Sequence, residues 1–216
     1  MEEKMLIFIK PDGYVRKYVG ARALKEIMKL EPSVDYFGEF RPDRMFMSDK
    51  HYANLKGKPI FEWLIRYVTS TPIIAMIIGG EGIAQKVRTL LGATLCENAD
   101  PSSIRGRYGI GRGMNVAHAS ESAEVGEKEV NMWKSMLNIL EGADYESKAR
   151  EYIEKYENYP MIDSLRFREV GEDLNKGKIK ADEAKETFKY FIAQETDLDI
   201  DSLDEFLSVS VDNFLR

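Results

Sequence analysis

The chain has 216 residues, of which 44% are hydrophobic and 31% charged, a composition typical of a globular protein with one or two domains. Its single cysteine, Cys96, excludes an internal disulfide and favours a reducing compartment. The chain starts with acidic residues and a short apolar run, so we expect no signal peptide. No stretch approaches the roughly 18 apolar residues of a membrane helix. We therefore expect a cytoplasmic protein without a membrane partner.

The formal net charge of −6 is distributed unevenly along the chain. Residues 135–216 contain 20 acidic and 11 basic side chains, whereas residues 1–134 contain 17 acidic and 20 basic ones. A mildly basic first part favours a small polyanionic substrate. No basic run is interleaved with aromatic residues, which argues against nucleic acid as the main partner.

The first half of the chain predicts strands that alternate with helices. Residues 5–9 form an apolar run typical of a buried strand, followed by a turn at Pro11 and Gly13. Lys10 therefore stands at a strand end, where a cation can meet phosphate. The next expected elements are a helix over 19–30, a strand over 34–47, a helix N-capped by Ser48, a helix starting at Pro59, a strand over 73–78, and a helix over 81–91 closed by Gly92.

Residues 92–114 show little periodicity and are rich in glycine, serine, asparagine and aspartate. A loop of this length inside a compact domain is usually functional. It contains Thr94 and Arg105, and Arg88 precedes it in the last turns of the helix. Either arginine alone would suit a solvated loop, but the set favours phosphate, because guanidinium groups donate to its oxygens two at a time.

A strand over 116–119 is expected to present His118, one of only two histidines. Ser122 should then cap a helix that runs to about residue 133 and carries Glu129. Neutral imidazole is nucleophilic without first losing a proton, and a carboxylate can hold its other ring nitrogen in one tautomer. A lone histidine is more often structural, which is how we interpret His51, because no comparable polar residues surround it.

In this order and spacing, these motifs resemble those of the nucleoside diphosphate kinase family over roughly residues 3–134. The resemblance rests on Lys10-Pro11-Asp12-Gly13, His51-Tyr52, Arg88, Thr94, Ile104-Arg105-Gly106, Asn115-x-x-His118-x-Ser120 and Glu129. The order of elements and the resemblance both indicate an α/β fold, a ferredoxin-like split βαβ sandwich with an antiparallel sheet. The resemblance also implies ping-pong transfer of the γ-phosphate from a nucleoside triphosphate to a diphosphate through a phosphohistidine at His118. It further implies a homo-oligomer, with Mg²⁺ held mainly by nucleotide phosphates rather than by protein ligands.

The resemblance also implies a role for each matching side chain. The residues that would hold the phosphates are Lys10, Tyr52, Arg88, Thr94 and Arg105. Asn115 and Lys10 would meet the ribose, and Ser120 and Glu129 would orient His118.

This chain departs from the family at three positions of the site. Ile60 stands where a phenylalanine usually stacks on the base, and Arg112 stands on the opposite side, where a small apolar residue is common. Ala119 replaces a glycine beside the histidine. We expect the phosphoryl chemistry to survive these changes.

Two other interpretations stay open at this point. The chain could be a degenerate kinase domain that acts as a nucleotide-binding or interaction module, or a carrier that receives phosphate on histidine from another protein. The complete set of phosphate-clamping residues argues against both.

Residues 135–216 lie outside the resemblance and predict an acidic, all-α extension of a kinase-like domain formed by residues 1–134. The expected helices cover 145–156, 165–174, 184–192 and 202–215, the last opened by a capping box of Ser202 and Glu205. Their apolar stripes are too large to leave in water, so we expect a compact subdomain packed against the core or a neighbouring subunit. Its net charge of −9 should keep it away from a phosphate pocket.

Overall fold

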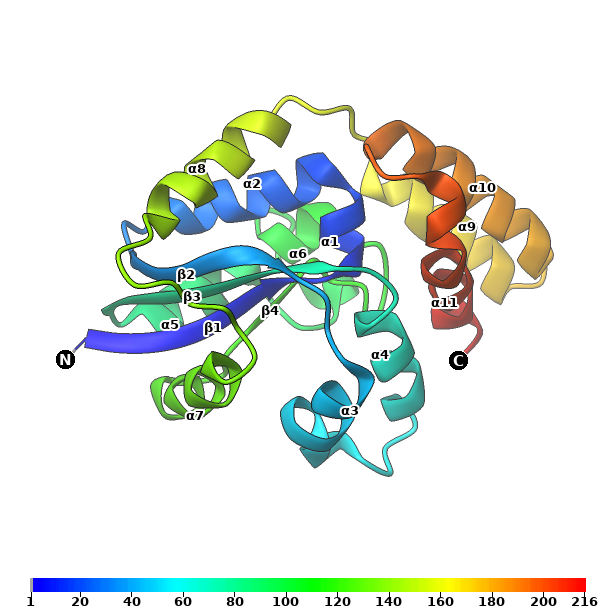
Figure 1. The fold of residues 1–216 in the computed structure, drawn as a ribbon. Helices are drawn as coiled ribbons and strands as arrows, with labels where there is room; N and C mark the ends of the chain where they lie inside the picture. Colours follow the sequence, from blue (N-terminus) through cyan, green and yellow to red (C-terminus); the bar gives the residue numbers. More distant parts are fainter. Residues whose placement is uncertain (1) are drawn as a thin grey trace.

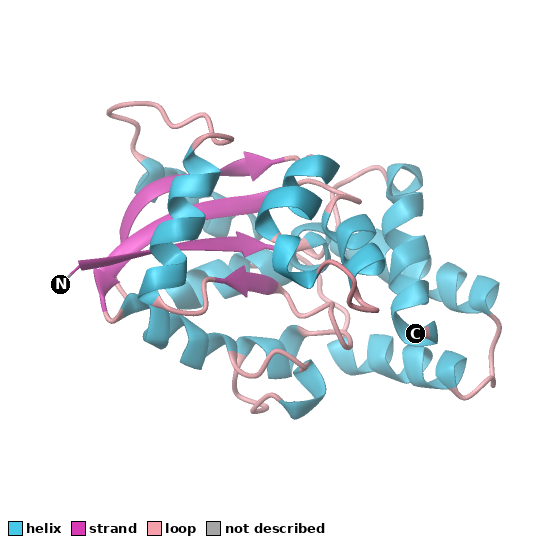
Figure 2. Ribbon diagram, turned by 90° about the horizontal axis from the view of Figure 1, so that it is seen from below, coloured by secondary structure: helices cyan, strands magenta, loops and turns pink. Residues whose placement is uncertain are grey.

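In the computed structural model, which describes residues 2–216, the strands form one antiparallel sheet in the order β2-β3-β1-β4 (Figures 1 and 2). The strands are β1 Glu2–Ile9, β2 Ser33–Phe40, β3 Ile73–Glu81 and β4 Ala117–Ala119. Residues 5–9 of the central strand β1 are completely buried, as their continuous apolar run predicts. The neighbours of β1 are the third and fourth strands in the chain, an arrangement that confirms the predicted split βαβ fold.

The described residues also form eleven α-helices. They are α1 Pro11–Val15, α2 Lys17–Met28, α3 Arg44–Phe46, α4 Phe61–Val68, α5 Ile83–Leu91, α6 Ile104–Tyr108, α7 Ala123–Lys134, α8 Tyr145–Tyr156, α9 Ser164–Asn175, α10 Ala181–Glu195 and α11 Asp204–Leu215. In Figure 1, α2 lies above the strands and α7 below them. The sheet is thus covered on both faces, which explains why its central strands β1 and β3 contain continuous apolar runs rather than alternating residues.

Several helices begin at other residues than the sequence pattern predicts. Pro11 starts helix α1 instead of forming a turn, because its missing N–H costs nothing in the first helical position. Asp43, not Ser48, caps the helix after β2, since its carboxylate accepts a 2.9 Å hydrogen bond from the Phe46 N–H. Helix α4 starts only at Phe61.

The two predicted serine caps have different outcomes. The Ser122 cap of α7 is confirmed, because its hydroxyl accepts the Val125 N–H at 3.2 Å. The Ser202 capping box is wrong, because Ser202 lies in a 3₁₀ turn and donates to the Asp199 carbonyl at 2.6 Å. Helix α11 therefore begins at Asp204.

The four helices of the extension do not form one compact unit. Helix α8 packs over α2 and the edge strand β2, whereas α9, α10 and α11 pack on one another at the other end of the molecule (Figure 1). Aromatic contacts explain the place of α8: Tyr145 lies 5.2 Å from Tyr36, and Tyr152 lies 5.9 Å from Phe37, between ring centroids. The apolar residues of all four helices belong to the same continuous core as the sheet.

A buried ion pair joins the extension to the start of the chain. The Arg16 Nε donates to Glu195 Oε2 at 2.8 Å, and its Nη2 donates to Oε1 at 3.1 Å. Both side chains are 1% exposed. The same guanidinium donates to the Tyr108 carbonyl at 3.0 Å, so α10 is tied to the segment that follows Lys10 and to the end of α6.

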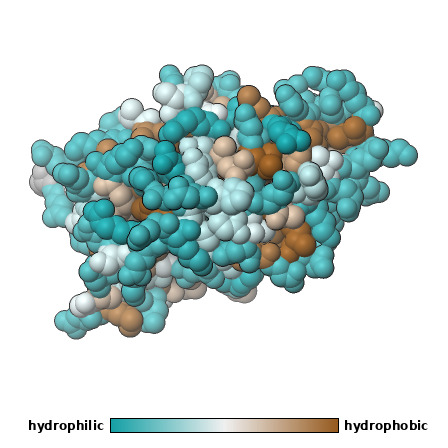
Figure 3. All heavy atoms as spheres, turned by 90° about the horizontal axis from the view of Figure 1, so that it is seen from above, coloured by the Kyte–Doolittle hydropathy of each residue, from teal (hydrophilic) through white to brown (hydrophobic). Residues whose placement is uncertain are grey.

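The surface has no continuous apolar face in the view from above. Figure 3 shows a mostly hydrophilic surface on which apolar residues form separate patches. Among residues 2–216, no helix combines the length and apolar character needed to cross a bilayer.

Candidate active site

Nearly all the residues singled out in the sequence meet at one pocket of about 350 Å³. Its lining includes Lys10, Tyr52, Ile60, Arg88, Thr94, Arg105, Asn115, His118, Ala119 and Glu129. Ser120 lies directly behind the pocket and is completely buried. Arg112 is not part of this lining; its guanidinium bonds instead to the backbone carbonyl of Arg216 at the end of α11. None of residues 135–216 is part of this lining.

His118 is presented by the short strand β4. Its pairing with β1 places His118 opposite Phe8, and the two rings stack with centroids 4.7 Å apart. His118 Nε2 lies 3.0 Å from Glu129 Oε2 on α7. Within residues 2–216, no group hydrogen-bonds to the other ring nitrogen, Nδ1, so this atom is free to react.

Glu129 is held by a second hydrogen bond. Its Oε2 also accepts the Ser120 hydroxyl at 2.6 Å, and the Ser120 Oγ in turn accepts the Leu6 N–H at 3.1 Å. Burial would raise the pKa of Glu129, but the hydrogen bond and charge of His118 outweigh it and lower that pKa. A carboxylate fixed in this way holds imidazole in the tautomer with its proton on Nε2.

His51 lies beside this group but is bound differently. Its Nδ1 accepts the Trp133 indole N–H at 3.1 Å, and its ring centroid lies 4.6 Å from that of His118. Burial, together with the nearby His118, lowers the pKa of His51 to about 3. His51 is therefore a neutral packing residue, as the sequence suggests.

One trio of potential metal ligands exists among the described residues. The ligand atoms of His51, His118 and Glu129 all lie within 4.8 Å of one another. One ring nitrogen of each histidine is already hydrogen-bonded, and the trio offers only one carboxylate. Mg²⁺ prefers oxygen ligands, so these residues do not form a magnesium cage.

Three cations face the pocket from separate segments. Lys10 Nζ donates to Asn115 Oδ1 at 2.7 Å, and burial, followed by the charge of Arg105, lowers the pKa of Lys10 to about 7. Arg105 donates to the carbonyls of Gly92 and Ala117, both at 2.9 Å. Burial and the nearby Arg88 lower the pKa of Arg105 to about 10, so it stays charged at neutral pH. This arrangement creates a positive potential suited to a polyphosphate.

The sequence gives no indication of the strained backbone beside the site. Val116 has a φ of 74°, which is rare for a β-branched residue. Its N–H donates to Asp12 Oδ2 at 2.9 Å, and its carbonyl accepts the Lys10 N–H at 2.8 Å. The Tyr67 hydroxyl donates to the same Asp12 carboxylate. Asp12 thus fixes the turn before His118.

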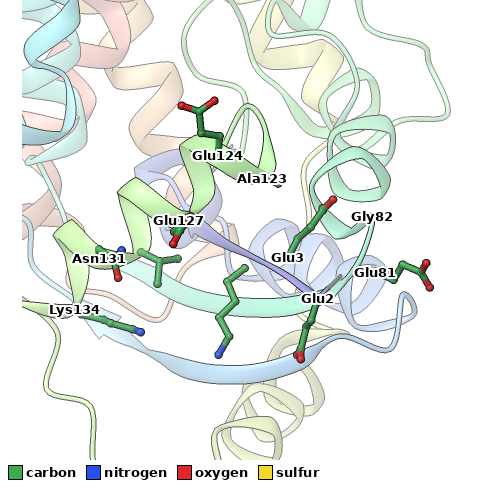
Figure 4. A pocket seen from close by; sticks show the side chains of 11 residues that line it. Glu2, Glu3, Glu81, Gly82, Ala123, Glu124, Glu127, Asn131 and Lys134 are labelled. Carbon is green, nitrogen blue, oxygen red and sulfur yellow. The ribbon is translucent and has the colours of Figure 1, made fainter.

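A larger groove elsewhere does not suit a phosphate ligand. Its volume is about 880 Å³, and it lies between the start of β1, the end of β3 and helix α7 (Figure 4). Its lining includes Glu2, Glu3, Glu81, Glu124 and Glu127 against only two lysines. The negative potential of five carboxylates repels a polyanion, so the smaller basic pocket is the candidate active site.

Comparisons with known protein sequences all point to one family. The sequence profile described as nucleoside diphosphate kinase matches residues 3–139. A nucleoside diphosphate kinase of Staphylococcus epidermidis is 34% identical over 154 residues, which cover 70% of this chain and 98% of that protein. One from Thermococcus kodakarensis is 37% identical over 163 residues, with 70% and 92% covered.

Solved structures agree with the sequence comparisons. The nucleoside diphosphate kinase of Aquifex aeolicus superposes with a TM-score of 0.59 at 29% identity, covering 65% of this chain and 100% of that one. The enzyme of Encephalitozoon cuniculi gives the same TM-score at 26% identity, covering 68% and 97%. In each comparison the relative is almost fully covered, while about a third of this chain remains outside. With its antiparallel split βαβ sheet, the chain therefore belongs to the nucleoside diphosphate kinase family.

Proposed function

We propose that this chain, a nucleoside diphosphate kinase, works by ping-pong transfer with His118 Nδ1 as the nucleophile. The observation that carries this assignment is the 3.0 Å contact between His118 Nε2 and Glu129, which leaves only Nδ1 free in the pocket. Nδ1 attacks the γ-phosphorus of a nucleoside triphosphate, and the bond to the bridging oxygen breaks as the diphosphate leaves. In the second half-reaction, a terminal oxygen of another diphosphate attacks the phosphohistidine, and the bond from phosphorus to Nδ1 breaks.

The proton on Nε2 stays in place during both steps. As Nδ1 bonds to phosphorus, positive charge develops on the imidazole ring, and the Glu129 carboxylate stabilises that charge. Ser120 keeps the carboxylate oriented. No general base is needed, because the reacting nitrogen already carries a lone pair.

We assign the other pocket residues to the nucleotide. The groups that bind and neutralise the phosphates are Lys10, Tyr52, Arg88, Thr94 and Arg105. Asn115 and Lys10, joined by their 2.7 Å hydrogen bond, bind the ribose. Ile60 contacts the base from the pocket wall. We assign no contact with the base to Arg112, because its guanidinium is held by the Arg216 carbonyl outside the lining.

The reaction uses a divalent metal ion, for which we propose Mg²⁺. An ion carried by the nucleotide suits this pocket, because three cations line it against two carboxylates, and one of these, Glu129, is occupied by His118 and Ser120. When bound together with the nucleotide, Mg²⁺ would neutralise part of the phosphate charge.

We further propose a cytoplasmic homo-oligomer that acts on free nucleoside di- and triphosphates. Residues 1–134 would form the kinase-like domain, and residues 135–216 its helical extension. We do not favour a degenerate domain or a phosphate carrier, because three cations converge on one histidine.

The test uses ATP labelled at the γ-phosphate, followed by a chase with GDP. Wild-type protein should form an acid-labile, base-stable phosphoprotein that GDP discharges to labelled GTP. The label should be lost in His118→Ala and kept in His51→Asn, in which an amide oxygen can still accept the Trp133 N–H. Label retained in His118→Ala would refute the assignment.

A further inference from the structure

Helix α6 carries Arg105 but is too short to satisfy its own carbonyl groups. It spans only Ile104–Tyr108, and the last four carbonyls of any helix lack partners within it. Its backbone also lies too close to its neighbour for a side chain at Gly106, where a Cβ would fall 2.0 Å from the Asp100 carbonyl oxygen. The C-terminal carbonyls of this helix therefore need hydrogen-bond donors from other segments.

Arg168 of helix α9 supplies these missing partners. Its Nε donates to the Gly109 carbonyl at 2.9 Å, and its Nη2 donates to the Gly106 carbonyl at 2.8 Å. The same Nη2 lies 3.4 Å from the carbonyl oxygen of Arg105 itself. A cation at the C-terminal end of a helix also interacts favourably with the helix dipole.

Two further side chains of the extension donate hydrogen bonds to carbonyls at and after the end of α6. The Ser164 hydroxyl, at the start of α9, lies 3.2 Å from the Tyr108 carbonyl oxygen, which also accepts from Arg16. Farther along the loop, Asn213 Nδ2 of α11 donates to the Gly111 carbonyl at 3.1 Å. The loop from Gly106 to Gly111 is thus held at several successive carbonyls by helices α9 and α11.

The opposite side of α6 faces the pocket. Arg105 lines it, and the guanidinium also bonds to the carbonyls of Gly92 and Ala117. Arg168 and the nucleotide site therefore contact the same five-residue helix from two directions. A shift of α6 would move the Arg105 guanidinium away from its phosphate position.

We propose that Arg168 is a positioning residue for phosphate binding, which fixes Arg105 by holding the C-terminal carbonyls of α6. The extension then has a role in substrate affinity, although none of residues 135–216 lines the pocket. This inference rests on the assignment of Arg105 to the nucleotide phosphates.

The test compares Arg168→Ala with Arg166→Ala in the full chain. Arg166 lies on the same helix and is exposed, with its guanidinium 4.6 Å from the centroid of the Phe191 ring, so its loss controls for charge and helix propensity. The dissociation constants of ADP and AMP are measured by calorimetry. Backbone hydrogen exchange is measured by mass spectrometry over residues 104–111.

In Arg168→Ala, the Kd of ADP should rise roughly tenfold, because lost charge-assisted hydrogen bonds release α6. The Kd of AMP, which lacks the terminal phosphate, should change less than about twofold. Exchange over residues 104–111 should be faster, while Arg166→Ala matches the wild type in all three measurements. Arg168→Lys keeps the charge but cannot reach two carbonyls at once, so its ADP affinity should be intermediate.

Wild-type ADP affinity in a folded Arg168→Ala, or an equal loss for AMP and ADP, would overturn the proposal. If Arg168→Ala does not fold, Arg168→Lys decides: wild-type affinity in that variant would mean that Arg168 serves folding alone. Binding of ADP requires no turnover. Failure of the proposed chemistry, seen as a wild type without phosphohistidine, is therefore distinguishable from failure of this inference.

Discussion

Glu129 Oε2 lies 3.0 Å from His118 Nε2 and 2.6 Å from the Ser120 hydroxyl, so one carboxylate oxygen fixes both side chains. In Glu129→Gln, a neutral amide replaces the carboxylate that stabilises the charged imidazole. We expect the rate of phosphohistidine formation to fall on the order of 10²-fold, with nucleotide affinity nearly unchanged. Rapid-quench measurement of single-turnover labelling by γ-labelled ATP checks this prediction.

The control for Glu129 is Glu124→Gln on the same helix. Glu124 is exposed and pairs only with Lys128 in the next turn, at 2.7 Å, so labelling should keep its wild-type rate. A Glu129→Gln enzyme as fast as this control would show that the carboxylate has no part in the phosphoryl step.

Lys10 makes nucleotide binding depend on pH. Burial lowers its pKa to about 7, so part of the population is neutral in the free protein at neutral pH. A bound polyphosphate favours the charged form and raises this pKa, and binding must therefore take up protons. We expect ADP affinity to be full below about pH 7 and to fall as the pH rises above it.

Calorimetry of ADP binding at pH 7.5 in buffers with different ionisation enthalpies measures this proton uptake directly. The uptake should vanish in Lys10→Met, which keeps a long side chain without the titrating group. Proton release on binding, or uptake of the same size in Lys10→Met, would contradict the prediction.

Ile60 lines the pocket without offering an aromatic surface. In Ile60→Phe, stacking on the base adds roughly 1 kcal/mol, equally in the ground and transition states. KM should fall about fivefold while kcat changes little. Steady-state kinetics with GDP as acceptor tests this. A changed kcat with an unaltered KM would mean that residue 60 does not contact the base.

Glu195 neutralises a guanidinium that is completely buried. In Glu195→Ala, the Arg16 charge loses its partner, and the free energy of unfolding should fall by about 3–5 kcal/mol. Urea denaturation followed by circular dichroism measures this change. Glu146→Ala breaks only the exposed pair with Arg150, at 2.6 Å, and should cost less than about 0.5 kcal/mol. Similar losses in the two variants would be inconsistent with our account of the buried pair.

The sequence predicts those features that depend on local pattern. The apolar run of β1 predicts a buried strand whatever its neighbours are. His118 and Glu129 are only 11 residues apart, so a strand, a turn and the start of a helix bring them together. A serine cap such as Ser122 also acts within one helical turn. These signals require no knowledge of distant partners.

What could not be predicted depends on contacts between distant segments. The left-handed backbone of Val116 exists because Asp12, 104 residues earlier, accepts its N–H. Amphipathic spacing identifies helix α8, but its position depends on contacts with α2 and with the aromatic residues of β2. In the same way, nothing in the sequence indicates that Arg168 of α9 donates to backbone carbonyls of α6.

The pairing of Arg16 with Glu195 has a consequence for how the protein is made. The two residues are 179 positions apart, so Arg16 has to stay hydrated on the ribosome until Glu195 has been synthesised. Domains usually fold as they emerge from the ribosome. Here the carbonyls at the end of α6 have no donor from α9 until that helix has also been synthesised. A nascent chain that stops before α10 leaves this arginine without its counter-ion. The nucleotide pocket is therefore completed only after helices α9 and α10 have been synthesised.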